Sequence, residues 1–149
     1  MSRLTPRSLF RGLAVAEAIT WALLLSGMFL KYVTETTELG VRIFGMVHGV
    51  VFIAYCLVTL IVAIDQKWSL SRTVLGLVAA VPPFATLLFE MYADRRGLLG
   101  PEWFSEHDSP TARERAVCWL LRHHRLATGL LVAAVAGLTG IALLVGPPA

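Results

Sequence analysis

Long apolar runs separated by short polar segments dominate the chain, and four of the runs are long enough to cross a lipid bilayer. A crossing needs roughly 20 apolar residues for a hydrocarbon core of ~30 Å. The runs predict helices over residues 12–30, 41–64, 71–92 and 126–146. The sequence therefore predicts an all-α fold, a membrane-embedded bundle of four transmembrane helices in a multi-pass protein of the cell membrane.

Two segments modify this simple pattern. Pro82 and Pro83 lie in the middle of the third run, where the missing backbone donors predict a kink or a break in the helix. The polar stretch before the fourth run predicts an amphipathic interfacial helix over 111–125. The predicted organisation is a three-helix membrane domain (1–96), a polar loop with the amphipathic helix (97–125), and a fourth transmembrane helix with a C-terminal tail (126–149).

Composition agrees with this interpretation. Hydrophobic residues make up 56% of the chain and charged residues 15%, against about 25% charged in soluble domains. The net charge of +3 comes from basic residues at helix ends, which gives no reason to expect a nucleic acid as partner. The first apolar run is too long for a cleaved signal peptide. Cys56 and Cys118 are far apart and predict neither a disulfide nor a zinc site.

Threading four antiparallel spans predicts where the polar residues gather. Side A is defined as the side of the membrane on which the first helix begins, and side B as the opposite side. If every run crosses the membrane, most polar side chains in or near the spans fall in the side-B half, and Glu17 alone stays near side A. The expected side-B set is Lys31, Tyr32, Arg42, His48, Glu90, Tyr92, His123 and His124.

Glu17 is the first candidate for chemistry because it lies inside the first helix, six residues after Arg11. An ionised carboxylate at that depth costs about 2.5–3.5 kcal/mol on insertion scales, so we expect it to be neutral or paired. One interpretation is an acid that carries a proton or anchors a ligand. The other is a carboxyl group that forms a structural hydrogen bond across the bundle.

His48 is the second candidate, since it interrupts the apolar run of the second helix. Gly45 and Gly49 beside it predict a close approach of a neighbouring helix. The expected partner of the imidazole is Glu90 of the third helix. A contact to a ligand or cofactor is the alternative to this structural role.

Catalytic and metal-binding motifs are missing from the sequence, so no catalytic residue, metal ligand or cofactor is predicted. Lys31 and Tyr32 end the first helix, where such residues usually anchor a helix at the membrane interface. A haem held by His48 with His123 or His124 is not expected, because the latter pair belongs to an arginine-rich stretch.

Three segments together resemble the YdzA-like integral membrane proteins, a bacterial family. They are FRGLAVAEAITWALLLSGMFLKYV, GMVHGVVFIAYC and PPFATLLFEMYADRR, in this order within residues 9–96. The resemblance implies a three-helix domain, to which this chain adds a fourth transmembrane helix, and it implies no reaction. Ala85 and Glu90 depart from the glycine and aspartate expected in the family.

The sequence favours a small membrane protein without catalytic chemistry that acts as an accessory or interaction component of a membrane assembly, or that self-associates. Its docking surface would be the fourth helix and the amphipathic helix before it. The alternative is a protein that handles a small ligand, a lipid or quinone, an ion or a proton through Glu17, Lys31, Tyr32, His48 and Glu90. The lipid bilayer is an expected partner in either case.

Overall fold

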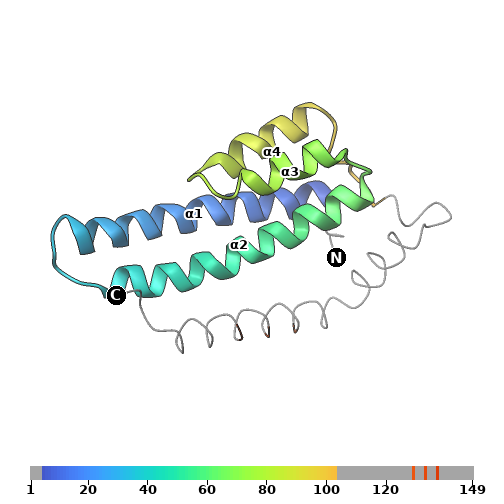
Figure 1. Ribbon diagram of the computed structural model, residues 1–149. Coiled ribbons are helices and arrows are strands. Elements are labelled where there is room, and N and C mark those ends of the chain that lie inside the picture. The colour runs from blue at the N-terminus through green and yellow to red at the C-terminus, as the bar shows by residue number, and fades with distance from the viewer. Residues whose placement is uncertain (1–4, 104–128, 130–132, 134–136, 138–149) are drawn as a thin grey trace.

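The computed structural model describes residues 5–103 and the isolated positions 129, 133 and 137 (Figure 1). Over residues 5–103 it is all-helical, with α1 (Pro6–Tyr32), α2 (Leu39–Asp65), α3 (Leu70–Val78) and α4 (Ala85–Arg95). The predicted amphipathic helix over 111–125, with His123 and His124, lies outside the described residues, as does nearly all of the predicted helix over 126–146.

Helices α1 and α2 form a long antiparallel pair, and both predicted spans are confirmed as helices long and apolar enough to cross a membrane. Each has 27 residues, or about 40 Å at 1.5 Å per residue. A capping box begins α1: the Thr5 hydroxyl accepts from the Ser8 backbone N–H, Ser8 caps the Thr5 N–H in return, and Pro6 occupies the first turn.

The predicted third span is broken rather than continuous. Its apolar run forms two short helices, α3 and α4, of 9 and 11 residues. They are about 14 and 16 Å long, too short to cross a hydrocarbon core of ~30 Å. Pro82 and Pro83 remove two successive backbone donors, and Phe84 takes a left-handed conformation with φ 65°. The expected break at the prolines is therefore present, and it reverses the chain.

Helices α3 and α4 make a hairpin that enters and leaves on side A (Figure 1). At the open end of the hairpin, Trp68 before α3 donates its indole N–H to the carbonyl of Leu98 after α4, at 2.8 Å. At the turn, the indole Nε1 of Trp21 lies 3.5 Å from the Ala80 carbonyl. The prediction that this segment crosses to side B is wrong, because the two prolines turn it back at the level of the middle of α1.

The hairpin encloses an aromatic core with the side-A halves of α1 and α2. The ring of Phe10 has no exposed surface and lies 5.5–6.0 Å, between ring centroids, from Tyr55, Trp68 and Phe89. Tyr55 donates its hydroxyl to the carbonyl of Gly76 at 3.1 Å. The Gly76 carbonyl lies in the last turn of α3, where carbonyl groups have no backbone N–H partner within the helix. The Tyr55 hydroxyl provides that partner.

The closest approach of α1 and α2 is not at the predicted glycines. A Cβ added at Gly27 would lie 2.7 Å from the carbonyl carbon of Gly40, whereas one added at Gly49 would meet nothing within 4 Å, and one at Gly45 only Leu24 at 3.9 Å. The two long helices therefore touch backbone to backbone at Gly27 and Gly40, near side B. The prediction of a close approach at Gly45 and Gly49 is wrong.

Candidate functional site

Glu17 lies in the interior between α1 and α4, and its side chain has no exposed surface. Its Oε2 lies 2.9 Å from the hydroxyl of Thr86, in the first turn of α4. Its other oxygen, Oε1, is buried and makes no hydrogen bond to any described residue. Glu17 is thus a carboxyl group near the turn of the hairpin, with Thr86 bonded to one oxygen and the Trp21 indole nearby, and its Oε1 has no hydrogen-bond partner among the described residues.

The hydroxyl of Thr86 faces two acceptors. It lies 2.9 Å from Glu17 Oε2 and 3.3 Å from the backbone carbonyl of Ala14. A hydroxyl has a single hydrogen to donate. The Ala14 carbonyl lies inside α1, where the backbone N–H four residues later is its regular partner. The Thr86 hydroxyl is therefore available as a donor to Glu17 Oε2.

Glu90 lies in the side-A half, so its predicted place on side B is wrong. Its Oε1 is 3.9 Å from the Nε of Arg11, and its side chain is 7% exposed. One turn further along α4, Asp94 forms an ion pair with Arg7 at 2.6 Å. The cause is the reversal at the prolines, which places α4 antiparallel to α1 and its acidic residues opposite the arginines of α1.

His48 does not pair with Glu90. Its Nδ1 lies 3.1 Å from the hydroxyl of Thr20, which in turn donates to the backbone carbonyl of Glu17 at 2.9 Å. The imidazole packs against Trp21, with ring centroids 4.6 Å apart. The prediction that Glu90 is the partner of His48 is wrong. Because the chain reverses at Pro82 and Pro83, Glu90 lies opposite Arg11 and not beside His48.

Lys31 and Tyr32 lie at the side-B end, away from the other predicted site residues. Lys31 Nζ is 3.4 Å from Glu38 Oε1 and 5.3 Å from the centroid of the Tyr32 ring. Glu17 precedes Lys31 by fourteen positions, about 21 Å along one helix. The five predicted residues therefore do not form one site. Glu17 of α1 and Glu90 of α4 lie at the contact between these two helices, His48 of α2 contacts Thr20 and Trp21 of α1, and Lys31 and Tyr32 end α1.

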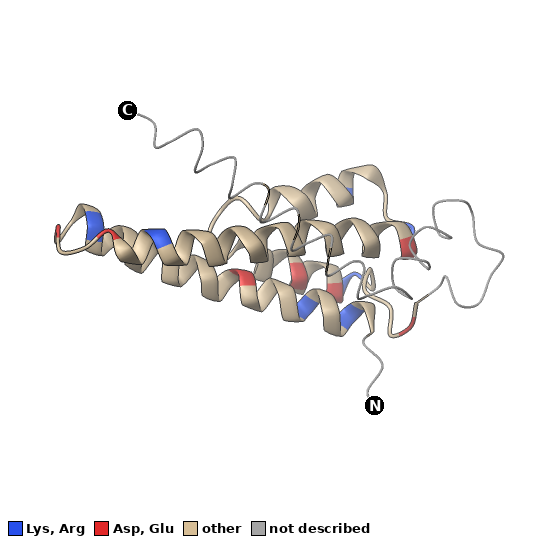
Figure 2. Ribbon diagram, turned by 90° about the horizontal axis from the view of Figure 1, so that it is seen from below, with Lys and Arg blue, Asp and Glu red and all other residues tan. Residues whose placement is uncertain are grey.

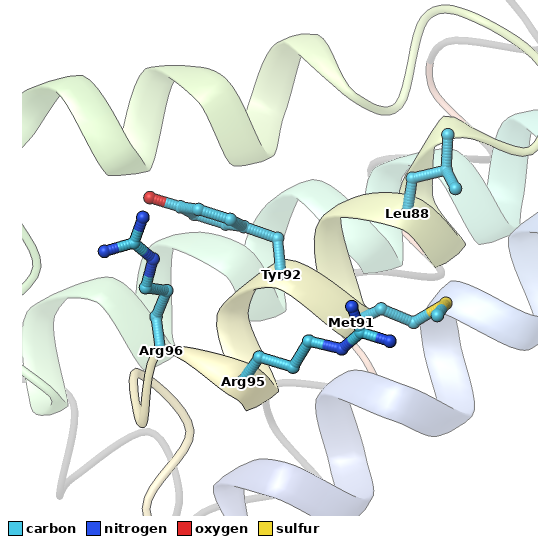
Figure 3. Close-up of a pocket in the computed structure, with 5 residues that line it drawn as sticks. All are labelled: Leu88, Met91, Tyr92, Arg95 and Arg96. Atoms are coloured by element: carbon cyan, nitrogen blue, oxygen red, sulfur yellow. The ribbon is translucent and has the colours of Figure 1, made fainter.

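Most charged residues of α1 and α2 lie toward the two ends of these helices, with Glu17 the exception inside α1 (Figure 2). A surface pocket of about 290 Å³ lies along α4, and Figure 3 shows the side chains that line it. It is lined by Leu88, Met91, Tyr92, Arg95 and Arg96. Tyr92, predicted on side B, belongs instead to this side-A pocket, where the Arg96 guanidinium lies 5.7 Å from its ring centroid.

Sequence reasoning missed two residues that complete these contacts, Thr86 and Thr20. Threonine is common in membrane helices and gave no signal as a single residue. Thr86, Glu90 and Asp94 are spaced four positions apart, which places three polar groups on one face of a helix. This spacing could have identified Thr86 as part of a polar face. Over residues 5–103 and positions 129, 133 and 137, no three His, Cys, Asp or Glu side chains come together as a metal site would require.

Comparison with known proteins places the chain among membrane proteins. SCO5905 of Streptomyces coelicolor is 58% identical over 91 residues, which cover 60% of this chain and 11% of that protein. YdzA of Bacillus subtilis is 36% identical over 87 residues, which cover 58% of this chain and 90% of YdzA. Both names describe membrane proteins, in agreement with the two candidate spans. No solved structure matches.

The model of a protein family, the domain of unknown function DUF3817, matches residues 7–95. The matched segment begins in the first turn of α1 and ends with the last residue of α4. It contains the long helical pair, the proline-turned hairpin and the Glu17–Thr86 contact, and it covers more than half of the chain. The resemblance to the YdzA-like proteins is confirmed, and the chain belongs to the DUF3817 family.

Proposed function

We propose that this chain is a multi-pass protein of the bacterial cell membrane that serves as a non-catalytic accessory module and binds a larger membrane protein. The observation that carries the proposal is the size of its relatives. The same domain accounts for 90% of YdzA but the matched segment is only 11% of the Streptomyces coelicolor protein. A domain that exists both nearly alone and as a small part of a long chain is suited to working beside a larger protein.

The described fold supports this role because half of the helical pair has no cover from the hairpin. No residue of α2 before Tyr55 is buried, and in α1 beyond Thr20 only Gly27 is buried. The uncovered surface is apolar, as at Phe29, Ile43 and Met46, which are about half exposed. Such a surface is complete only when lipid or another helix lies against it.

In this proposal, the docking surface is supplied by a further span at residues 126–146 together with the polar segment before it. Three positions four residues apart, Gly129, Ala133 and Gly137, are exposed. A Cβ added at Gly129 or Gly137 would meet no described atom within 4 Å. Small residues repeated at this interval let a second helix approach closely in a membrane.

Quantitative co-purification from the native membrane tests the proposal. We expect a larger membrane protein to accompany the chain in a fixed ratio by native mass spectrometry. Gly137→Leu should reduce that ratio, because the added side chain has free space within this chain and obstructs only a partner. His48→Ala, at a residue that contacts Thr20 and Trp21 of α1, serves as the control and should leave the ratio unchanged. A chain that purifies alone or only with itself, or a ratio unaffected by Gly137→Leu, contradicts the proposal.

The second candidate function is the handling of a proton, an ion or a small ligand such as a quinone or lipid. One observation favours it, the buried oxygen of Glu17 that has no partner among the described residues. The predicted cluster of Glu17, Lys31, Tyr32, His48 and Glu90 is too dispersed to hold one small ligand. This candidate therefore depends on Glu17 and the residues of α4 around it.

A further inference from the structure

Helices α1 and α4 are joined by a line of polar contacts, here called the α1–α4 seam. On α4 the polar residues Thr86, Glu90 and Asp94 recur at every fourth position, so they lie on one face of the helix. The opposing face of α1 supplies two arginines and Glu17. The seam pairs Arg7 with Asp94 (2.6 Å), Arg11 with Glu90 (3.9 Å) and Glu17 with Thr86 (2.9 Å).

Burial increases along the seam from the side-A surface inward. The Asp94 side chain is 27% exposed, the Glu90 side chain is 7% exposed, and Glu17 is completely buried. Each of the two outer carboxyl groups faces a guanidinium, which provides the counter-charge for its ionised form. Within residues 5–103 no cation forms an ion pair with Glu17, and its hydrogen-bond partner is the neutral hydroxyl of Thr86.

The other titratable groups around Glu17 leave its free oxygen without a competitor. Tyr55 of α2 donates its hydroxyl to the Gly76 carbonyl, and no described hydrogen bond joins Cys56 to Glu17. His48 of α2 is engaged with the hydroxyl of Thr20. The charged residue of α3, Arg72, is exposed.

We propose that Glu17 is a proton-binding site that exchanges its proton with side A along the α1–α4 seam, through Glu90 and Asp94. In the neutral state the Glu17 O–H is held by Thr86. On release, the O–H bond breaks, its electron pair stays on the carboxylate, and the proton passes to the carboxylate of Glu90. Glu90 then returns to its ionised form as the proton moves to Asp94 and to water.

Among residues 5–103, the polar groups of the seam continue from Glu17 and Thr86 toward the side-A surface through Glu90 and Asp94. Toward side B the next polar groups are Thr20 and His48, and Thr20 is bonded to the Glu17 backbone carbonyl rather than to its carboxyl group. No described hydrogen bond joins the Glu17 carboxyl directly to His48 or to Glu90, so the side-A direction rests on the row of carboxyl groups along α4. The arrangement therefore suits a proton that binds and leaves from side A, and this inference does not depend on the proposed accessory role.

Infrared difference spectroscopy of the full chain in lipid vesicles, recorded between acidic and alkaline pH, tests the site itself. We expect a carbonyl band of a protonated carboxylic acid that disappears at alkaline pH and is missing in Glu17→Gln. Glutamine keeps both an acceptor and a donor for Thr86, so the helix content measured by circular dichroism should not change. A difference spectrum that is the same in the parent chain and in Glu17→Gln, or a Glu17 band that persists at all pH values, overturns the proposal.

A pH jump followed in the same band tests the route. We expect Glu90→Gln to slow proton release from Glu17 on the order of 10²-fold, the low end of what a positioned acid or base contributes to proton transfer. Glu38→Gln is the matched control, because Glu38 also pairs with a cation but at the side-B end. Equal rates in the parent chain and in Glu90→Gln would exclude the seam as the path. Slower labelling of Glu17 by a carbodiimide in the presence of Na⁺ at constant pH would assign the site to a metal cation instead.

Discussion

The two halves of the α1–α2 pair differ in how they are held together. In the side-A half the α3–α4 hairpin covers both helices, and Phe10, Tyr55, Val62 and Phe89 form a core like that of a soluble protein. In the side-B half the helices meet at Gly27 and Gly40, and apolar side chains such as Phe29 face outward.

This difference arises because the α3–α4 hairpin covers only the side-A half of the α1–α2 pair. Because the hairpin turns back at the level of the middle of α1, it forms an aromatic core with the side-A half of the pair. It also makes the three polar contacts of the α1–α4 seam, the innermost of which is that of Glu17 with Thr86. The other half keeps a surface for lipid or for another helix. The buried core and the candidate site therefore lie in the side-A half, while exposed apolar side chains such as Phe29, Ile43 and Met46 extend toward side B.

The difference between the two halves exists only if the α3–α4 segment returns to the side from which it entered. A test of the side on which its two ends lie therefore has the largest expected effect. Ser69 and Arg96 are exposed on either side of the α3–α4 segment. In a background without native cysteines, we expect Ser69→Cys and Arg96→Cys to react with an impermeant maleimide from the same side of sealed vesicles. Reaction from opposite sides would mean that the segment crosses the membrane, and the contrast between the halves would then fail.

Truncating one phenylalanine in each half should give very different losses of stability. Phe10→Ala removes a ring with no exposed surface, and such changes cost about 3–5 kcal/mol. Phe29 is 55% exposed, and surface substitutions usually stay within about 0.5 kcal/mol. Reversible unfolding in mixed micelles measures both values. Similar losses at the two positions would contradict a core confined to side A.

Substitutions of glycines in the side-B half should change the free energy of unfolding by a smaller amount, and they test the helix contact in that half. In Gly27→Ala the new methyl group would lie 2.7 Å from the backbone of Gly40, and such overpacking costs about 1–3 kcal/mol. Gly49→Ala has open space and should be neutral or slightly stabilising, because alanine is the better helix former. The same unfolding assay applies, and a tolerated Gly27→Ala would show that the helices do not meet there.

Much of the fold could be predicted from the chain because apolar length is a local property. The runs at 12–30 and 41–64 correspond to α1 and α2, and Pro82 and Pro83 correspond to the break after α3. Glu17 was recognised as a candidate because a carboxyl group among apolar residues is unusual wherever the chain folds. The segments that suggested the YdzA-like family lie within the region matched by the family model.

The direction of the chain after the prolines could not be predicted in the same way. A proline predicts that a helix is interrupted, but a kinked crossing and a reversal satisfy the same local rule. The choice rests on contacts between distant residues: Trp68 with Leu98, Trp21 with Ala80, and Arg7 with Asp94. An incorrect direction placed Glu90 and Tyr92 on the wrong side and gave His48 the wrong partner.

The sequence by itself predicted an all-helical chain with four membrane spans, of which two are confirmed as helices suited to a membrane, and an interruption at Pro82 and Pro83. It also singled out Glu17 as an acid within an apolar run. These follow from hydrophobicity, length and missing backbone donors, which are properties of neighbouring residues. Only the tertiary structure decided that Thr86, Glu90 and Asp94 lie against Glu17, Arg11 and Arg7. That pairing joins residues up to 87 positions apart, and it exists because the hairpin returns to the side from which it entered.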